Sequence, residues 1–198
     1  MRDSRWEVAS GDADFAPYLA GQPAASTEMF MRFVELRDRR REPSDGLGRD
    51  VISFELRPAT PADSEFCFQL HKAAMGCYVT AIWGWDDAVQ RDFHASKFDP
   101  SRWQIITIDG AAVGILIVEY RPAEIYLARI EIHPDHQGRG IGASLIRQLT
   151  DQAHRRGQHL ALDVLVVNDR ALAFYRRHGL REEARHGDGG IKVRMRCD

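Results

Sequence analysis

Three glycines at alternate positions, Gly138, Gly140 and Gly142, stand between a predicted strand and a predicted helix. The strand is the apolar run EIYLARIEI, and the helix is IGASLIRQLTDQAHRR, which ends before Gly157. The first turn of a helix carries unpaired N–H groups and a partial positive charge. Glycines also lack the Cβ atoms that would hold an anion away. The turn therefore predicts a backbone site for a phosphate or diphosphate.

Other glycine-rich turns are less consistent with the chain. No lysine follows these glycines, which excludes a P-loop nucleotide triphosphatase. Gly138, Gly140 and Ala143 do fit the dinucleotide-binding pattern G-x-G-x-x-G/A. That pattern normally opens a series of parallel strands and has an acidic residue after the second strand, where this chain has Asn168. A dinucleotide-binding domain and a plain turn before a helix remain as alternatives.

The order of elements predicts a mixed α/β fold. A strand near 51–57 is followed by two helices, near 62–79 and 85–96, then by strands near 103–108, 111–120 and 124–132. After the glycine turn come a helix, a strand at 159–167, a helix ending at Gly179 and two closing strands. We expect a central, largely antiparallel sheet with helices on both faces, in which the crossover through the long helix makes two strands parallel.

The 198 residues have room for one ordinary domain, and we place it at residues 51–198. Residues 1–50 are rich in glycine and proline and are expected to form a partly flexible extension, with a helix over 27–40. That helix ends in the basic run Arg37–Arg41, which suits a solvated helix terminus. A translation start at Met29 or Met31 is a further alternative.

Charge and hydropathy narrow the choice of partners. The net charge of −2 does not favour a nucleic-acid-binding domain. The longest apolar stretch, Ala111–Tyr120, is too short to span a membrane, and the N-terminus lacks the apolar segment of a secretory signal. Three cysteines, an odd number, are typical of reduced thiols. We therefore expect a cytoplasmic protein with no nucleic-acid or membrane partner.

Two segments together resemble the GCN5-related N-acetyltransferase (GNAT) superfamily. IEIHPDHQGRGIGASLI is similar to its motif A, whose core Q/R-x-x-G-x-G/A is filled by Gln137, Gly140 and Gly142. VLVVNDRALAFYRRHGL is similar to motif B, with Asn168, Tyr175 and other matching positions. The resemblance covers Val51 to the C-terminus. It implies a GNAT-like acyl-CoA N-acyltransferase fold that moves an acetyl group from acetyl-CoA to a primary amine by direct transfer in a ternary complex.

The resemblance also implies how coenzyme A is held. The strands 125–132 and 160–167 should splay apart, and the pantetheine arm should pair with backbone groups near Ile130 and Ile132. Asn168 would fix the cofactor through its amide. The diphosphate would lie on the turn, whose residues are Gln137, Gly138, Arg139, Gly140, Ile141, Gly142 and Ala143. No metal is expected, because His133, Asp135 and His136 lie in an irregular turn without further ligands.

An alkylammonium must lose a proton before it can attack a thioester, so a base is needed. The candidates are Glu131 and Glu124, with His133 as a weaker one. Strict alternation would place Leu127, Arg129, Glu131 and His133 on one face of the strand. A salt bridge between Arg129 and Glu131 is the equally weighted structural explanation for that acid.

The remaining roles rest on the resemblance. Tyr175 matches the position of the acid that protonates the leaving thiolate, the alternative being a tyrosine that only packs with Phe174. Trp83 and Trp85 are candidate walls of the acceptor pocket, whereas Asp86 suits a helix cap. The acceptor would be an amine of a small molecule or a peptide. A non-catalytic acyl-CoA-binding module and a homodimer both stay open.

Overall fold

The structure is a computed structural model, and it describes residues 53–198. The predicted order of helices and strands is confirmed, with three short 3-10 turns added. The strands and helices, in chain order, are β1 (Glu55–Pro58), α3 (Ser64–Trp83), α4 (Asp87–Lys97), β2 (Gln104–Ile108), β3 (Ala111–Tyr120), β4 (Glu124–Ile132), α5 (Ile141–Arg155), β5 (His159–Leu165), α6 (Asp169–Arg177), β6 (Arg181–His186) and β7 (Lys192–Cys197).

The seven strands form one sheet in the order β1-β2-β3-β4-β5-β7-β6. Only β4 and β5 run parallel, and every other neighbouring pair is antiparallel. The parallel pair follows from the crossover through α5, which carries the chain back to the end of the sheet at which β4 begins. The mixed α/β fold with a largely antiparallel sheet is therefore confirmed.

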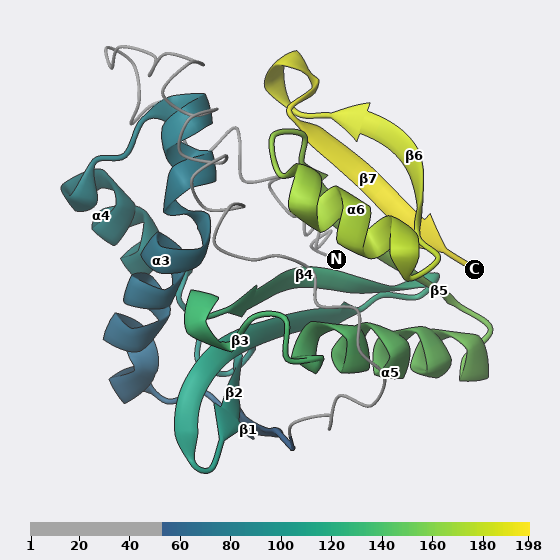
Figure 1. The fold of residues 1–198 in the computed structure, drawn as a ribbon, viewed down its shortest axis with the longest axis horizontal. Helices are drawn as coiled ribbons and strands as arrows, with labels where there is room; N and C mark the ends of the chain where they lie inside the picture. Colours follow the sequence, from purple (N-terminus) through teal and green to yellow (C-terminus); the bar gives the residue numbers. More distant parts are fainter. Residues whose placement is uncertain (1–52) are drawn as a thin grey trace, which may run out of the picture.

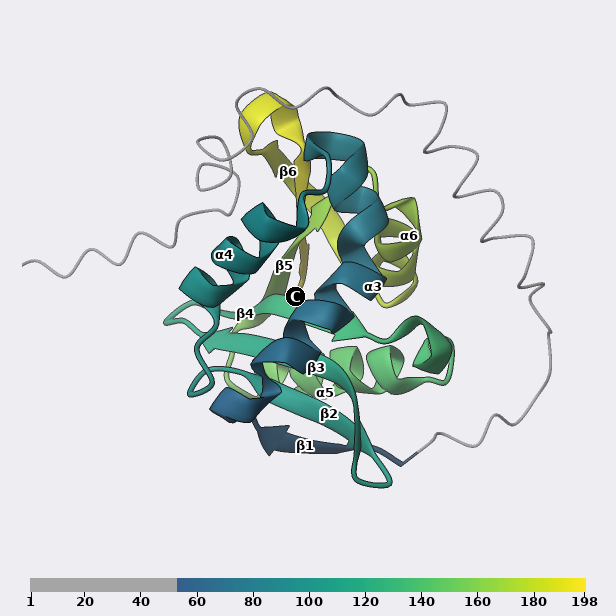
Figure 2. The same cartoon turned by 90° about the vertical axis from the view of Figure 1, so that its left-hand side faces the viewer.

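Helices cover both faces of the sheet (Figures 1 and 2). On one face, α5 and α6 bury Leu145, Leu149 and Leu172 against apolar side chains of the central strands. On the other face, α3 packs Cys67 and Leu70 against β2 and β3. Two apolar layers thus hold the sheet in place, which is how helix-covered sheets gain most of their stability.

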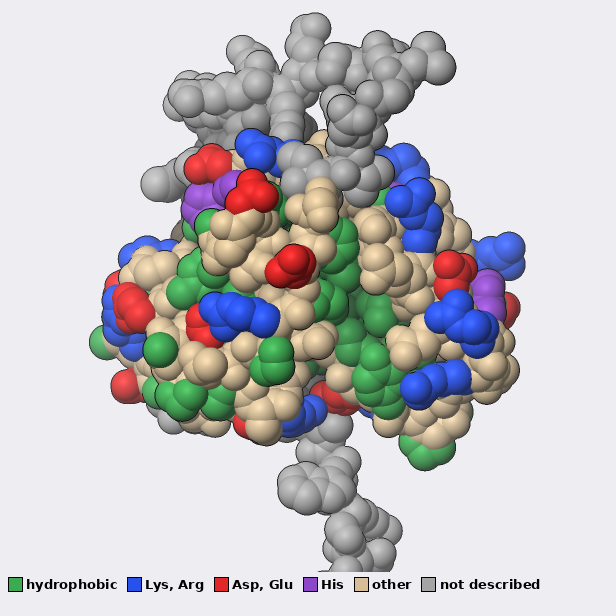
Figure 3. Space-filling model, turned by 90° about the horizontal axis from the view of Figure 1, so that it is seen from below, with side chains coloured by type: hydrophobic (Ala, Val, Ile, Leu, Met, Phe, Trp, Pro, Cys, Tyr) green, Lys and Arg blue, Asp and Glu red, His purple; other side chains and the backbone are tan. Residues whose placement is uncertain are grey.

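One surface view shows where apolar side chains reach the exterior. In Figure 3 they gather in a band through the middle of the face, and many charged side chains lie to either side of it.

No helix among residues 53–198 is both long and apolar enough to cross a bilayer. The predicted helix over 27–40, the basic run Arg37–Arg41 and the extension of residues 1–50 lie outside the described residues.

The strands β4 and β5 separate after four paired positions. Glu124 to Leu127 pair with His159 to Leu162, and the remaining residues of β4 have no partner on β5. The separation begins at a β-bulge, since Ile117 and Val118 of β3 face Arg129 and Leu127, which leaves Ala128 as the extra residue. The predicted V between the two strands is present, and the bulge lies at its apex.

The bulge corrects one sequence expectation. Strict alternation placed Leu127 on the same face as Arg129 and Glu131, but Leu127 packs in the α5 layer together with Ile130 and Ile132. Arg129 instead lies near the ring of Trp103, in the α3 layer. An extra residue in a strand reverses the alternation beyond it, so strict period-two reasoning fails from Ala128 onward.

Candidate functional site

The glycine turn forms a short backbone cradle at the start of α5. Gly138 and Gly140 have φ values of 73° and 86°, which residues with a Cβ rarely adopt. Gln137 fastens the turn to the end of β4, because its Nε2 donates to the carbonyl oxygen of Ile132 at 2.8 Å. The first N–H groups of α5 therefore face outward beside a fixed strand end, as an anion site requires.

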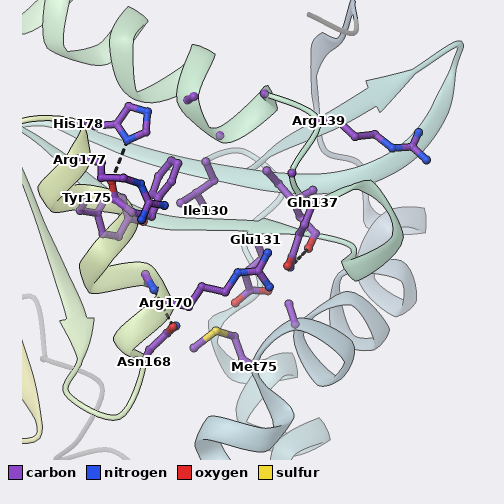
Figure 4. A pocket seen from close by; sticks show the side chains of 18 of the residues that line it. Met75, Ile130, Glu131, Gln137, Arg139, Asn168, Arg170, Tyr175, Arg177 and His178 are labelled. Atoms are coloured by element: carbon purple, nitrogen blue, oxygen red, sulfur yellow. Dashed lines mark hydrogen bonds between the residues drawn. The ribbon is translucent and has the colours of Figure 1, made fainter. Parts of the chain in front are cut away.

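This cradle opens into a cavity of about 480 Å³ (Figure 4). Its walls come from the middle of α3, the free end of β4, the turn and α6. They include three arginines, and their residues are Ala74, Met75, Tyr78, Ile130, Glu131, Ile132, Gln137, Gly138, Arg139, Gly140, Gly142, Ala143, Asn168, Arg170, Ala171, Phe174, Tyr175, Arg177 and His178. Eleven of the predicted site residues thus lie around one space.

The free edge of β4 turns backbone groups toward the V. The carbonyl of Ile132 faces Gln137, whereas the N–H of His133 donates to Val113 of β3. Backbone directions alternate along a strand, so Ile130 presents its N–H and C=O to the same side as Ile132. Since β5 does not pair there, these groups can bond an extended ligand as an added strand would.

Asn168 caps α6. Its Oδ1 accepts a hydrogen bond from the N–H of Ala171 at 3.0 Å, which satisfies one of the unpaired donors of the first turn. The side-chain oxygen is therefore used within the fold. The amide nitrogen of Asn168 is the donor that this side chain can offer a ligand in the cavity, whose wall includes the residue.

Tyr175 lies on α6 with 9% of its surface exposed and its ring against Phe174, at a centroid distance of 5.2 Å. Burial raises the pKa of its phenol, so the hydroxyl stays protonated at neutral and mildly alkaline pH. Tyr175 also lines the cavity. The two sequence interpretations of this residue, packing and proton donation, are thus geometrically compatible.

Glu131 is the buried acid of the cavity wall, with 6% of its surface exposed. Its Oε1 lies 2.8 Å from Nδ1 of His71 and 3.8 Å from the guanidinium of Arg129. Burial by itself would raise the pKa of this carboxyl. The charges of His71 and Arg129 outweigh burial and hold the pKa below its usual range, so the group is a carboxylate at neutral pH.

The structure does not bring Glu124 to the cavity. It lies at the opposite end of β4, where its carboxylate contacts Arg194 at 2.5 Å, Arg121 at 2.7 Å and His159 at 3.2 Å. Burial opposes ionisation there, but the two arginines lower the pKa of Glu124 overall. The residue therefore serves as the centre of an ion-pair cluster.

The two tryptophans do not line the cavity. Trp85 packs between α3 and α4, near the rings of Phe68 and His71, and its Nε1 donates to Asp87. Trp83 lies in the last turn of α3. The helix wall of the cavity is instead made by Ala74, Met75 and Tyr78. Asp86 caps α4 as expected, accepting from the N–H of Val89 at 3.0 Å.

Sequence reasoning missed several residues of the site. Arg170 and Arg177 are two turns apart on α6 and line the cavity, a spacing visible in the sequence once the helix is assigned. His71 gave no sequence signal, because it meets Glu131 across 60 positions. Asp163 of β5 lies just past the last β4–β5 pair but does not line the cavity, because it accepts from the hydroxyl of Tyr126 at 2.7 Å and lies 3.8 Å from Arg194.

No group of three or more His, Cys, Asp or Glu side chains suited to a metal ion occurs within residues 53–198. His133 and Asp135, two of the three residues of the turn that were considered for a metal, lie 3.5 Å apart at the surface.

Comparison with known proteins identifies relatives of both the sequence and the fold. The chain is 37% identical over 84 residues to streptothricin acetyltransferase of Streptomyces lavendulae and 42% identical over 82 residues to N-alpha-acetyltransferase RimI of Mycobacterium tuberculosis. The matched segments are 41% and 39% of this chain and 44% and 51% of those proteins. The chain thus spans about half the length of the curated relatives it matches.

Solved structures share the fold at low sequence identity. A PaiA N-acetyltransferase from Thermoplasma acidophilum, in complex with coenzyme A, superposes with a TM-score of 0.59 at 16% identity, over 73% of this chain and 98% of that one. An acetyltransferase from Thermus thermophilus gives 0.56 at 24% identity, over 74% and 97%. The model of the acetyltransferase (GNAT) family matches residues 65–180, more than half of the sequence. The chain belongs to the acetyltransferase (GNAT) family.

Proposed function

We propose that the protein transfers an acetyl group from acetyl-CoA to a primary amine of a small molecule or a peptide, while both are bound. One observation carries the proposal. The glycine cradle, the unpaired edge of β4, a buried carboxylate and a buried phenol all border one cavity. Membership of the acetyltransferase family and the coenzyme A complex of a fold neighbour support it.

The described residues fit coenzyme A at each part of its length. The N–H groups from Gly138 to Ala143 would bind the diphosphate, and Arg170 and Arg177 would add positive charge beside it. The backbone of Ile130 and Ile132 would pair with the pantetheine amides. When bound, the cofactor supplies an acetyl group activated as a thioester.

The chain's own groups then handle two protons. Glu131 is ionised and buried, so it can accept a proton from an alkylammonium and leave the amine with a free electron pair. Burial keeps Tyr175 protonated, so a proton is present for the departing sulfur, and the same burial makes the phenol a weaker acid than usual. Backbone N–H groups of the β4 edge would polarise the acetyl carbonyl.

The relatives indicate the breadth of the acceptor class. One is named for streptothricin, a small molecule, and another for an N-alpha-amine. A fold neighbour from Escherichia coli, at 21% identity, is named for an alanine of ribosomal protein S18. These names support a primary amine as the reacting group.

The test is release of coenzyme A by the full chain over a broad panel of amines, with Glu131→Gln and Asp163→Asn as paired variants. We expect Glu131→Gln to lower kcat at least about 100-fold, the usual contribution of a positioned base. Asp163→Asn removes the acid on the other arm of the V and should lose much less. If Asp163→Asn lowers kcat more than Glu131→Gln does, the base is Asp163 of β5 and not Glu131. Tight coenzyme A binding without turnover of any amine would instead support a binding module.

A further inference from the structure

His71 and Glu131 form a buried pair that links α3 to β4 across the wall of the cavity. The Nδ1 atom of His71 lies 2.8 Å from Oε1 of Glu131. The other oxygen, Oε2, is buried and has no hydrogen-bond partner within the described residues. Glu131 borders the cavity, whereas His71 is not among its lining residues. One oxygen is therefore bonded to His71, and the other is buried without a partner in the wall of the cavity.

The ring of His71 is mostly buried and has an aromatic neighbour. Its side chain is 17% exposed, and the ring of Trp85 lies at a centroid distance of 6.2 Å. Trp85 donates from Nε1 to Asp87, in the first turn of α4, at 2.7 Å. The imidazole thus has a packed position at the junction of α3 and α4, from which it can hold the carboxylate in one orientation.

Arg129 does not duplicate this contact. Its guanidinium approaches Oε1 to 3.8 Å, which is an ion-pair distance but is longer than a hydrogen bond. The same group lies 5.4 Å from the ring centre of Trp103. Arg129 therefore adds charge to the site, while His71 alone among the described residues donates a hydrogen bond to this carboxylate.

We propose that His71 is a positioning residue for Glu131: its Nδ1–H donates to Oε1 and so holds the carboxylate in the cavity wall, with the unpartnered Oε2 as the oxygen that takes the proton of the acceptor amine. The inference rests on the proposed function. In the step it serves, an N–H bond of the alkylammonium breaks, an O–H bond forms at Oε2, and the electron pair stays on nitrogen. An ionised carboxylate only accepts hydrogen bonds, so the hydrogen between the two residues belongs to His71.

The charges around Glu131 fix the expected pH effect. The groups that face it are His71 and Cys67 from α3, His94 from α4 and Arg129 from β4. Burial raises the pKa of the Cys67 thiol to about 12 and lowers that of His94, so both are neutral at pH 8. Without His71, burial is opposed mainly by Arg129, and the pKa of Glu131 rises.

The experiment compares His71→Leu and His71→Asn in the full chain, with the amine that the wild type acetylates best. His71→Leu should lower kcat about 10- to 100-fold, as small misplacements of catalytic groups do, and leave the KM for acetyl-CoA unchanged. The acidic limb of its pH–rate profile should move to higher pH. His71→Asn places an N–H near the former Nδ1, so it should recover most of kcat while keeping the shifted limb.

A double variant keeps the test independent of folding. Leucine opposite a buried carboxylate can unfold the chain, whereas Glu131→Gln with His71→Leu leaves no buried carboxylate there. The double variant should be no slower than Glu131→Gln alone, because residues that act through one another are not additive. His154→Leu, which removes a histidine on α5 far from the cavity, is the matched control and should keep wild-type kinetics.

Wild-type kcat and an unshifted pH profile in His71→Leu would overturn the inference and leave the proposed function standing. So would an additional loss in the double variant, or a His71→Asn variant as slow as His71→Leu. Absence of turnover with every amine in the wild type would overturn both. Stabilisation by coenzyme A, measured for each variant, shows that the cradle is intact in all of them.

Discussion

Glu124 and Glu131 stand on the same strand, and each is followed by isoleucine, yet their surroundings separate their chemistry. Glu124 lies where β4 pairs on both sides and has two arginines within 2.7 Å. Glu131 lies beyond the bulge, beside the cavity, and one of its oxygens is unpartnered within the described residues. A carboxylate whose oxygens are all committed to arginines is a poor proton acceptor, so only Glu131 suits that task.

The substitution Tyr175→Phe removes only the phenol oxygen and so tests whether this residue is the proton donor. We expect kcat to fall about 100-fold, because the leaving sulfur loses its proton donor. Burial keeps the phenol of the wild type protonated above its usual range, so this group should not create a basic limb below pH 10. Steady-state rates from pH 6 to 10 measure both effects. An unchanged kcat would leave Tyr175 as a packing residue only.

At the scale of elements, one side chain at the N-terminus of α6, that of Asn168, has both a structural role and a position facing the ligand. Asn168 caps the helix through Oδ1 and borders the cavity. The two roles use different atoms, so substitutions can separate them.

Asn168→Asp keeps an oxygen for the cap and removes the amide donor, whereas Asn168→Ala removes both. We expect alanine to cost about 1 kcal/mol of folding free energy and aspartate to cost little. Both should weaken coenzyme A binding. Urea unfolding and calorimetric titration provide the two readouts. If the aspartate variant binds coenzyme A as tightly as the wild type, the amide of Asn168 has no part in binding.

The entry to α3 depends on the carboxylate of Asp63, which closes a capping box with Thr60 over the short 3-10 turn Pro61–Asp63. Its carboxylate accepts from Arg57 at 2.7 and 2.9 Å and from the N–H and hydroxyl of Thr60 at 2.8 and 2.9 Å. The bonds from Arg57, aided by Thr60, hold the pKa of Asp63 well below its usual range, although burial opposes them. A carboxylate with so many partners ties β1 to the beginning of α3.

Asp63→Asn should therefore destabilise the fold by roughly 1–3 kcal/mol at pH 7. A depressed pKa contributes stability that is present above the unfolded value, near 3.9, and is lost as the pH falls through the folded value. The difference between wild type and variant should thus shrink steadily below about pH 4. Denaturant unfolding at pH 7, 5 and 3 measures it. A difference independent of pH would mean that the ionised form is not what matters.

At the scale of the whole molecule, one sheet supports the entire cavity. The cradle follows β4, the cap of α6 follows β5, and α3 supplies the far wall (Figures 1 and 4). These pieces are far apart in the chain, and the sheet order brings them together. A ligand that touches all three should stabilise the fold as a unit.

Residues 51–198 are predicted to act as an independent acetyltransferase domain. A chain restricted to them should gain about 2.7 kcal/mol when coenzyme A is present at 100 times its Kd, as the full chain should. Thermal unfolding of both chains, with and without coenzyme A, provides the comparison. Loss of this stabilisation on removal of residues 1–50 would assign them a part in binding.

The sequence alone predicts those features of the fold that depend on residues next to one another in the chain. Asp109 and Gly110 predict the tight turn between β2 and β3, and both have positive φ, of 49° and 79°. The spacing of Gly138, Gly140 and Gly142 predicts an anion cradle for a similar reason, since positive φ values and missing Cβ atoms are local properties. The resemblance added the family, which the comparisons confirm.

Features that depend on contacts between residues distant in the chain are visible only in the tertiary structure. The bulge at Ala128 arises from pairing with β3, and it reversed the faces that alternation assigned to the end of β4. Which acid faces the cavity was settled by Arg194 and His71, respectively 70 and 60 positions away from the glutamates they contact. Local propensity carries no information on such contacts, because burial and charge pairing exist only after the sheet has assembled.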